Sequence, residues 1–355
     1  MVIDTFRWLV NEAALHDLLV LLSMPLLLFI VALCIAVLSF GADWMIEGVV
    51  GLAIRTGFPT IVIGATIISL GTTMPEAFVS VMAAYMGNPG LALGNGVGSI
   101  IADTGLIFGL TCVLATLPVN KFILNRTGWI QIGSAVLLVL LSLLALAVAT
   151  EGSLPKLQRW MGFFLLGLLL CYLYLTYFWA RQSHYEITKI LETPEPTEAK
   201  RLWLSWVMII GGLLAVIASA RVLVPTASEV AVRLGVPDDV IAATLVAFGT
   251  SLPELVTAIS AIRKGHPEIT VGNIVGADVL NVLFVIGAAA AATPLEIPPN
   301  FFLFHFPAML IILVSFRLFI SMNKSGSFQR WQGGWLLGIY GVYVFLQYAL
   351  NLGTK

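Results

Sequence analysis

Charged side chains are scarce in this chain of 355 residues, since aspartate, glutamate, lysine and arginine together make up 10% of it. A soluble domain usually has about 25%, and 59% of this chain is hydrophobic, so it lacks the polar surface that a soluble protein or a soluble enzyme needs. The net charge of −1 gives no positive field for nucleic acid. The three cysteines lie in apolar runs, which excludes a disulfide framework or a zinc motif. The first residues lack the basic start and small-residue cleavage site of a signal peptide.

What the chain has instead is a succession of long apolar runs. At roughly 20 residues for each membrane-spanning helix, they predict an all-α integral membrane protein with ten transmembrane helices, embedded in the bilayer of the cell membrane as a multi-pass protein. The predicted helices cover residues 18–50, 58–85, 91–117, 128–149, 160–180, 203–232, 238–262, 269–293, 300–322 and 333–352. Residues 1–17 form a polar N-terminal segment, and a polar linker, 181–202, separates a first half, 18–180, from a second half, 203–355.

The basic residues of the loops predict how these helices are oriented, because loops rich in lysine and arginine stay in the cytoplasm. If the N-terminus lies outside, 12 basic residues fall on the inner side and 5 on the outer side. We therefore expect both termini outside and the linker in the cytoplasm.

The chain matches itself, without a gap, at a shift of 178 residues. Gly71-Thr72-Thr73-Met74-Pro75-Glu76 recurs as Gly249-Thr250-Ser251-Leu252-Pro253-Glu254, and further matches define two repeats at residues 57–109 and 235–287. Chance similarity between apolar helices would match leucine and valine, whereas these matches are glycine, proline, threonine, asparagine and glutamate. Five predicted spans, an odd number, separate the copies, so they cross the membrane in opposite directions. Two inverted five-helix repeats with broken helices are the architecture of secondary transporters.

Each repeat has a proline inside a predicted helix, Pro75 and Pro253. Proline has no amide hydrogen and clashes with the carbonyl four residues back, so each helix is expected to open where its backbone faces protein or a wet cavity. The freed carbonyls lie beside hydroxyl groups and the carboxylates of Glu76 and Glu254. These oxygen donors are the ligands of hard cations such as Ca²⁺ and Na⁺. Because a carboxylate at the bilayer centre costs roughly 2.5–3.5 kcal/mol, we expect ions or protons to neutralise it.

The next predicted helix of each repeat has two glycines four residues apart. They are Gly94 and Gly98 in the first repeat and Gly272 and Gly276 in the second. This spacing is typical of closely packed membrane helices, and such packing would bring polar side chains against the opened hexapeptides. Asn95 and Asn273 fit two roles equally well, as ion ligands or as hydrogen-bond donors between helices.

Over nearly its whole length the chain resembles the sodium/calcium exchangers of the cation/Ca²⁺ exchanger superfamily, on the two hexapeptides above all. The resemblance implies an antiporter, not an enzyme, that exchanges Na⁺ for Ca²⁺ by alternating access, with these ions and the lipid bilayer as partners, no cofactor and a monomer as functional unit. The ion ligands that it implies are Glu76, Glu254, Thr72, Thr250, Thr73, Ser251, Ser99, Asp103 and Asn281, with backbone groups of Ser69 and Ala247; Asn95, Asn273 and Ala277 would lie behind them.

Two departures from the family pattern leave the coupling ion open. The second repeat has Ala277 where the first has Ser99, so one Na⁺ site lacks a hydroxyl ligand, and Asp103 of the first repeat corresponds to Asn281. Ala277 favours a Ca²⁺/H⁺ exchanger on the same scaffold, whereas the hydroxyl groups of Thr72, Thr73 and Ser251 favour Na⁺.

A cation channel is a further alternative of a different class. An antiparallel repeat within one chain does not place a selectivity filter on a symmetry axis, which argues against it. Arg221 lies where the repeat predicts a partner of Asp43, and either an ion pair between them or an arginine that reaches the membrane surface accounts for it.

Overall fold

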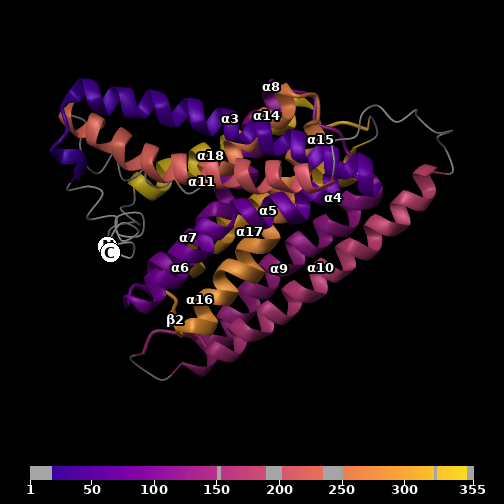
Figure 1. Cartoon of the computed structure of the whole chain (residues 1–355). Helices are drawn as coiled ribbons and strands as arrows, with labels where there is room; N and C mark the ends of the chain where they lie inside the picture. Colours follow the sequence, from indigo (N-terminus) through magenta and orange to yellow (C-terminus); the bar gives the residue numbers. More distant parts are fainter. Residues whose placement is uncertain are drawn as a thin grey trace.

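The computed structural model describes residues 18–149, 153–188, 202–234, 249, 251–323 and 326–349. This part of the chain is largely helical (Figure 1). Its long uninterrupted helices are α3 (Met24–Thr56), α9 (Lys121–Val148), α10 (Arg159–Thr188), α11 (Leu202–Arg233), α17 (Phe306–Met322) and α18 (Arg330–Ala349).

The helices of the two repeats are broken into shorter pieces, some of them π-helical and labelled η. The first repeat contains α4 (Thr60–Ile63), η1 (Gly64–Ile68), α5 (Ser69–Thr72), α6 (Met74–Tyr85), α7 (Pro89–Ile101), η2 (Ala102–Phe108) and α8 (Gly109–Leu114). The second contains α14 (Leu252–Arg263), α15 (Pro267–Leu280), η4 (Asn281–Ile286) and α16 (Gly287–Ala292). Outside the repeats lie η5 (Phe301–His305), before α17, and two short strands, β1 (Lys156–Leu157) and β2 (Leu295–Glu296).

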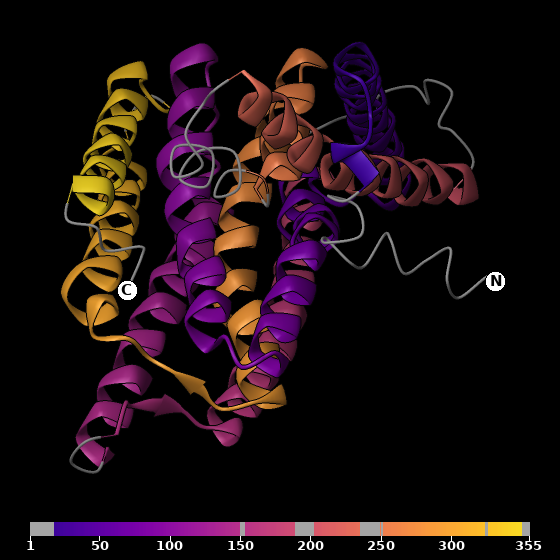
Figure 2. The same ribbon diagram turned by 90° about the vertical axis from the view of Figure 1, so that its left-hand side faces the viewer.

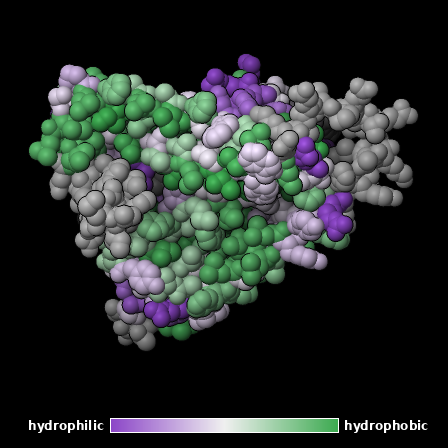
Figure 3. Space-filling view, viewed as in Figure 1, coloured by the Kyte–Doolittle hydropathy of each residue, from purple (hydrophilic) through white to green (hydrophobic). Residues whose placement is uncertain are grey.

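Eight helices of the described residues are long and apolar enough to cross a membrane. Apolar residues cover much of the face seen in Figure 3, and hydrophilic ones gather near its top, right and lower left. Both observations agree with the predicted helical membrane protein. Of the two other predicted spans, α14 covers the end of the one at 238–262 and α18 lies at the one at 333–352; the count of ten helices stays a prediction, because residues 235–248 and 250 lie outside the described residues, as do 1–17 and most of the linker.

The fourth helix begins at Lys121 and not at residue 128, where the apolar run predicts it. The side-chain oxygen of Asn120 accepts a hydrogen bond from the amide of Ile123 at 3.2 Å, a typical helix N-cap. Arg126 lies over the ring of Phe122 at 3.8 Å. The first two turns of α9 are therefore helical although Lys121, Asn125, Arg126 and Thr127 make them less apolar than the rest of the helix, so hydropathy alone does not predict them.

Helices α3 and α11 pack against each other and lie across the other helices at a steep angle (Figure 1). Glycines make the contact close: a Cβ atom at Gly41 would lie 2.9 Å from the carbonyl oxygen of Gly212, and one at Gly48 would lie 2.7 Å from that of Ser205. The other helices stand as a bundle, with α18 (yellow) on the far side from α3 (indigo) in Figure 2. The fold thus consists of a helix pair and a bundle beneath it.

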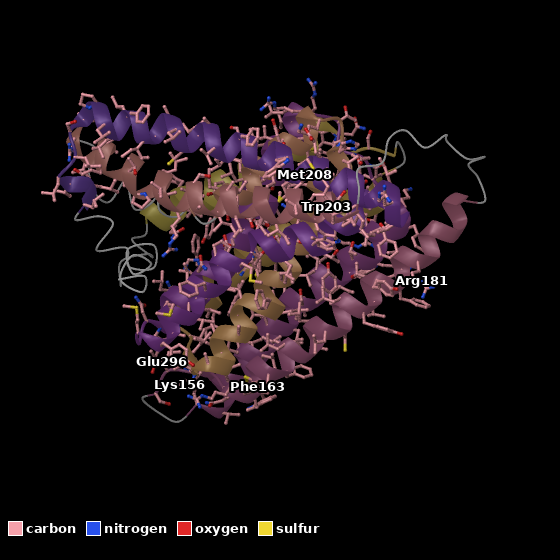
Figure 4. All side chains as sticks on the ribbon, in the orientation of Figure 1. Lys156, Phe163, Arg181, Trp203, Met208 and Glu296 are labelled. Atoms are coloured by element: carbon pink, nitrogen blue, oxygen red, sulfur yellow. The ribbon has the colours of Figure 1, made fainter. Side chains whose placement is uncertain are left out.

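Two pairs of loops are joined at opposite ends of this bundle. β1 pairs with β2 antiparallel, and Lys156 forms a salt bridge of 2.9 Å with Glu296, at the end opposite Arg181 in Figure 4. At another place the amide of Val119 donates to the carbonyl of Gly326 at 2.8 Å. Each pairing joins loops that the predicted threading places on one side of the membrane.

Candidate cation site

The residue two positions before the proline has the same backbone conformation in both repeats. In the first, α5 ends at Thr72 and α6 begins at Met74, and Thr73 between them has φ −83° and ψ −5°. In the second, α14 begins at Leu252, and Ser251 before it has φ −85° and ψ 9°. The same backbone geometry thus recurs at corresponding residues, in front of Pro75 and Pro253.

The glutamates of the two hexapeptides lie in the first turns of α6 and α14, and both are buried. Glu76 is 1% exposed and Glu254 is 2% exposed. Glu254 lies close enough to Glu76 and to Asp103 for their charges to interact. Among the described residues, no basic side chain interacts electrostatically with any of these three acids.

Hydrogen bonds join the two repeats at this place. The hydroxyl of Thr72 donates to the carboxylate of Glu254, and that of Ser251 donates to the carboxylate of Asp103. The amide of Asn281 lies 3.4 Å from Asp103 Oδ2 and donates to it. Each bond connects one repeat with the other, so the two copies of the motif meet in one polar cluster.

Many oxygens of this cluster have no hydrogen-bond partner among the described residues, although they are buried. They are both carboxylate oxygens of Glu76, Oε2 of Glu254, Oδ1 of Asp103 and Oδ1 of Asn281. The buried hydroxyls of Thr73 and Ser99, two further predicted ligands, have no partner among the described residues either. Buried polar groups are normally paired, and leaving one unpaired costs roughly 1–3 kcal/mol. A hard cation would satisfy these oxygens.

Carboxylates alone do not make this site. The described residues contain no group of three histidine, cysteine, aspartate or glutamate side chains arranged to hold a metal ion. Any ion bound here would therefore need amide, hydroxyl and backbone oxygens as well, which is the mixed set that the cluster offers.

Asp103 and Asn281, which occupy corresponding positions in the two repeats, both lie in π-helical turns. Asp103 is the second residue of η2, and Asn281 is the first residue of η4. The positions correspond exactly one repeat apart in number, since 281 − 103 is 178. Single π-turns are frequent at functional sites, and this pair is a second structural feature that the two halves share.

Of the remaining predicted residues, Ser69 and Ala277 lie in the described part of the chain. Ser69 is buried, and its hydroxyl donates to the carbonyl of Gly64 at 3.0 Å. Ala277 is buried in α15. Thr250 and Ala247 lie outside the described residues.

The two asparagines of the glycine motifs form hydrogen bonds between helices. Asn95 donates to the backbone carbonyl of Glu76 at 3.0 Å and to the Ser80 hydroxyl at 2.9 Å. Asn273 donates to the Thr257 hydroxyl at 3.4 Å. Both amides thus hold a second repeat helix against the helix that bears the glutamate, which supports the second of the two roles that the sequence left open.

The glycines of the second repeat bring α15 against the backbone of α4 and η1. A Cβ atom at Gly272 would overlap the carbonyl oxygen of Ile61, and one at Gly276 would overlap that of Ala65. In the first repeat, a Cβ atom at Gly94 would have its nearest described neighbour at 3.8 Å, a ring atom of Phe301. The residues that correspond to Ile61 and Ala65 one repeat later lie outside the described residues.

One buried acid next to this cluster is absent from the predicted site. Asp278 of α15 is 1% exposed and accepts hydrogen bonds from Thr104 and Gln131. A signal was present in the sequence, because the repeat aligns this acid with an apolar residue, Ile100. Asp43, for its part, accepts a hydrogen bond from Ser260, and its pairing with Arg221 stays a prediction.

Comparison with known proteins bears on both halves of the chain. One family model, described as sodium/calcium exchanger protein, matches twice, at residues 26–178 and at residues 204–349. The inner membrane protein YrbG of Escherichia coli is 32% identical over 332 residues, which cover 91% of this chain and 97% of that protein. The sodium/calcium exchanger MaX1 of Methanosarcina acetivorans is 28% identical over 343 residues, which cover 87% of this chain and 95% of that protein.

Solved structures show the same fold. The structure of a sodium/calcium exchanger from Methanococcus jannaschii matches with a TM-score of 0.75 and 26% identity, over 91% of this chain and 99% of that one. A structure of that exchanger soaked with Na⁺ and Sr²⁺ matches with a TM-score of 0.74. With its long apolar helices, the chain is a multi-pass protein of the cell membrane.

Proposed function

Because this chain belongs to the sodium/calcium exchanger family, a family of membrane transporters, we propose that it is an antiporter that exchanges Na⁺ for Ca²⁺. The observation that carries the proposal is the meeting of Glu76 and Glu254, one from each repeat, in a buried cluster whose oxygens lack hydrogen-bond partners and whose acids lack a basic neighbour among the described residues. Such a cluster is stable in a membrane only when positive charge enters it. Relatives named as sodium/calcium exchangers support the choice of ions.

In this proposal, Ca²⁺ and Na⁺ compete for the same oxygens. Ca²⁺ binds the carboxylates of Glu76 and Glu254 with the backbone carbonyls of Thr72 and Thr250. Na⁺ uses the same carboxylates together with a larger set of side chains and carbonyls: Thr72, Thr73, Thr250, Ser251, Ser99, Asp103, Asn281, Ser69 and Ala247. Since the carboxylates are occupied either by Ca²⁺ or by Na⁺, one ion replaces the other and leak is disfavoured. No catalytic residue, cofactor or second subunit is required.

The proposed topology has ten spans in two inverted halves, 18–180 and 203–355, with both termini outside. The two matches of one family model support two related halves. The loop pairings support the threading, because each of them joins loops that this topology places on the same side. The recurrence of the same backbone conformation before the two prolines, and of the π-turn, supports the internal symmetry.

We propose that access alternates when α3 and α11 slide together across the bundle. Their close contact at glycines makes them one unit. Where α11 touches the hexapeptides, the contacts are made by apolar side chains. Leu213 lies against Gly71, and a Cβ atom placed at Gly249 would lie 2.8 Å from Val224. Apolar contacts of this kind are non-directional, so they allow sliding at a small cost.

The test is uptake of radioactive Ca²⁺ into proteoliposomes loaded with Na⁺, at the same pH on both sides. Uptake is expected for the wild-type protein and is expected to be lost in Glu76→Gln and in Glu254→Gln. Glu296→Gln is the matched control, because it removes a glutamate from a half-exposed salt bridge at the end of the bundle. Normal uptake by either of the first two variants would contradict the assignment of the site.

The same vesicles separate the rival functions. Ala277, which removes one hydroxyl ligand, favours the Ca²⁺/H⁺ exchanger as the second candidate. Uptake driven by a pH gradient in the absence of Na⁺ would establish that candidate. Ca²⁺ flux that needs no counter-ion would instead indicate a channel.

A further inference from the structure

Besides Glu76, Glu254 and Asp103, the buried acid Asp278 lies next to the exchange site, which does not explain its surroundings. It lies on α15, and its Oδ2 accepts a hydrogen bond from the Thr104 hydroxyl of η2 and one from Gln131 Nε2 of α9, at 2.5 Å for the latter. Three separate segments therefore converge on one carboxylate. All three side chains are buried, with 1% exposure or less.

This cluster is short of positive charge. Asp278 Oδ1 and Gln131 Oε1 are buried and have no hydrogen-bond partner among the described residues. The charged group that interacts with Asp278 is Asp103, which is also an acid. Among the described residues, no basic side chain interacts electrostatically with Asp278. A buried carboxylate in such surroundings is costly unless it is paired, so the cluster points to a positively charged ligand.

The cluster is also absent from the other half of the molecule. At a shift of 178 residues, each of its three polar residues corresponds to an apolar one: Asp278 to Ile100, Thr104 to Val282 and Gln131 to Met309. These three apolar residues are fully buried. The fold is thus built with hydrocarbon at this place in one half, so folding alone does not require a carboxylate, an amide and a hydroxyl in the other.

We propose that Asp278, Gln131 and Thr104 bind a dehydrated monovalent cation, beside the exchange site and distinct from it. The two unpartnered oxygens, Asp278 Oδ1 and Gln131 Oε1, are available to it without loss of the bonds that Oδ2 accepts. Carboxylate, amide and hydroxyl oxygens suit hard cations, and a single carboxylate balances a single charge. The proposal concerns a binding event and does not depend on which ions the exchange site transports.

The experiment uses the purified full-length double variant Glu76→Gln/Glu254→Gln, so that the exchange site lacks both of its central charges. Its unfolding temperature is followed by tryptophan fluorescence, with the 9 tryptophans of the chain as reporters. NaCl, KCl and LiCl are compared with choline chloride at constant ionic strength and constant pH. At least one alkali cation is expected to raise the unfolding temperature with concentration, because a ligand that binds only the folded state stabilises it.

Adding Asp278→Asn to the double variant is expected to abolish this rise, while adding Glu296→Gln is expected to leave it intact. Gln131→Met, which introduces the residue of the other half, is expected to weaken the rise and serves if Asp278→Asn fails to fold. Comparing Na⁺ with K⁺ identifies the preferred cation. The proposal is overturned if no alkali cation has an effect, if neither substitution changes the effect, or if the effect follows pH and not the cation. If the wild-type protein showed no Na⁺/Ca²⁺ exchange in proteoliposomes but the rise in unfolding temperature were observed, the proposed function would be refuted and the cation site would not.

Discussion

The packing of α15 against the first repeat can be tested at Gly272. A Cβ atom there would overlap the carbonyl oxygen of Ile61 and would lie 3.0 Å from its carbonyl carbon and 3.2 Å from the amide nitrogen of Ala65. Ordinary contact begins at 3.4 Å, so the carbonyl carbon alone requires a shift of 3.4 − 3.0, or 0.4 Å, and the oxygen requires more. All these atoms are backbone, so no side chain can turn away.

We therefore expect Gly272→Ala to destabilise the protein. Overpacking costs about 1–3 kcal/mol, and the gain of alanine over glycine in a helix offsets about 1 kcal/mol, which leaves a loss of up to about 2 kcal/mol. Exchange is expected to fall as well, because α15 continues into η4 and Asn281, and its neighbour η1 continues into α5 and Thr72.

The measurements are the unfolding temperature in detergent and Na⁺-driven Ca²⁺ uptake. Gly133→Ala on α9 is the matched control, since no described atom lies within 4 Å of its added Cβ, and it is expected to be neutral or slightly stabilising. Wild-type stability together with wild-type uptake in Gly272→Ala would refute the reasoning, because α15 could then move away from the first repeat without consequence for the site.

Two further predictions concern the elements around the site. Tyr172 donates to the carbonyl of Ala65, a residue of η1, at 3.1 Å; Tyr172→Phe is expected to cost about 0.5–1.5 kcal/mol and to slow uptake, and an unchanged unfolding temperature would show that η1 does not need this bond. Asp43 of α3 and Ser260 of α14 are in hydrogen-bond contact. A disulfide between cysteines at these two positions, in a background without the native cysteines, is expected to stop uptake until a reductant is added, whereas uptake by the oxidised protein would contradict sliding of α3.

The paired hexapeptides are the part of the site that the sequence predicts best. Proline and glutamate are rare inside membrane helices, so their recurrence at a fixed shift carries far more information than recurring leucine would. The prolines also locate the helix breaks, because proline acts locally on the backbone.

Features that depend on the neighbours of a helix were not predictable from the sequence. Every residue of α15 from Ile269 to Leu280 is buried, whereas α3, which is more apolar, has many exposed side chains. Hydropathy therefore does not predict which of the two helices is buried. The π-turns of η2 and η4 have no sequence signature comparable to a proline. The polar start of α9 was missed because helix capping, and not hydropathy, decides where that helix begins.

The two halves resemble each other in backbone more closely than in charge. The first contributes Glu76 and Asp103 to the region of the site, and the second contributes Glu254 and Asp278, so each half supplies two buried acids to this region. In the second half, however, an asparagine occupies the position of Asp103, and the acid lies three residues earlier, about 60° away around an ideal helix. That offset aims it at Gln131 and Thr104 and away from the position that corresponds to Asp103. A shift of three residues therefore suffices to turn a symmetric set of acids into a central cluster and one acid beside it, which gives the two related halves unequal electrostatic roles.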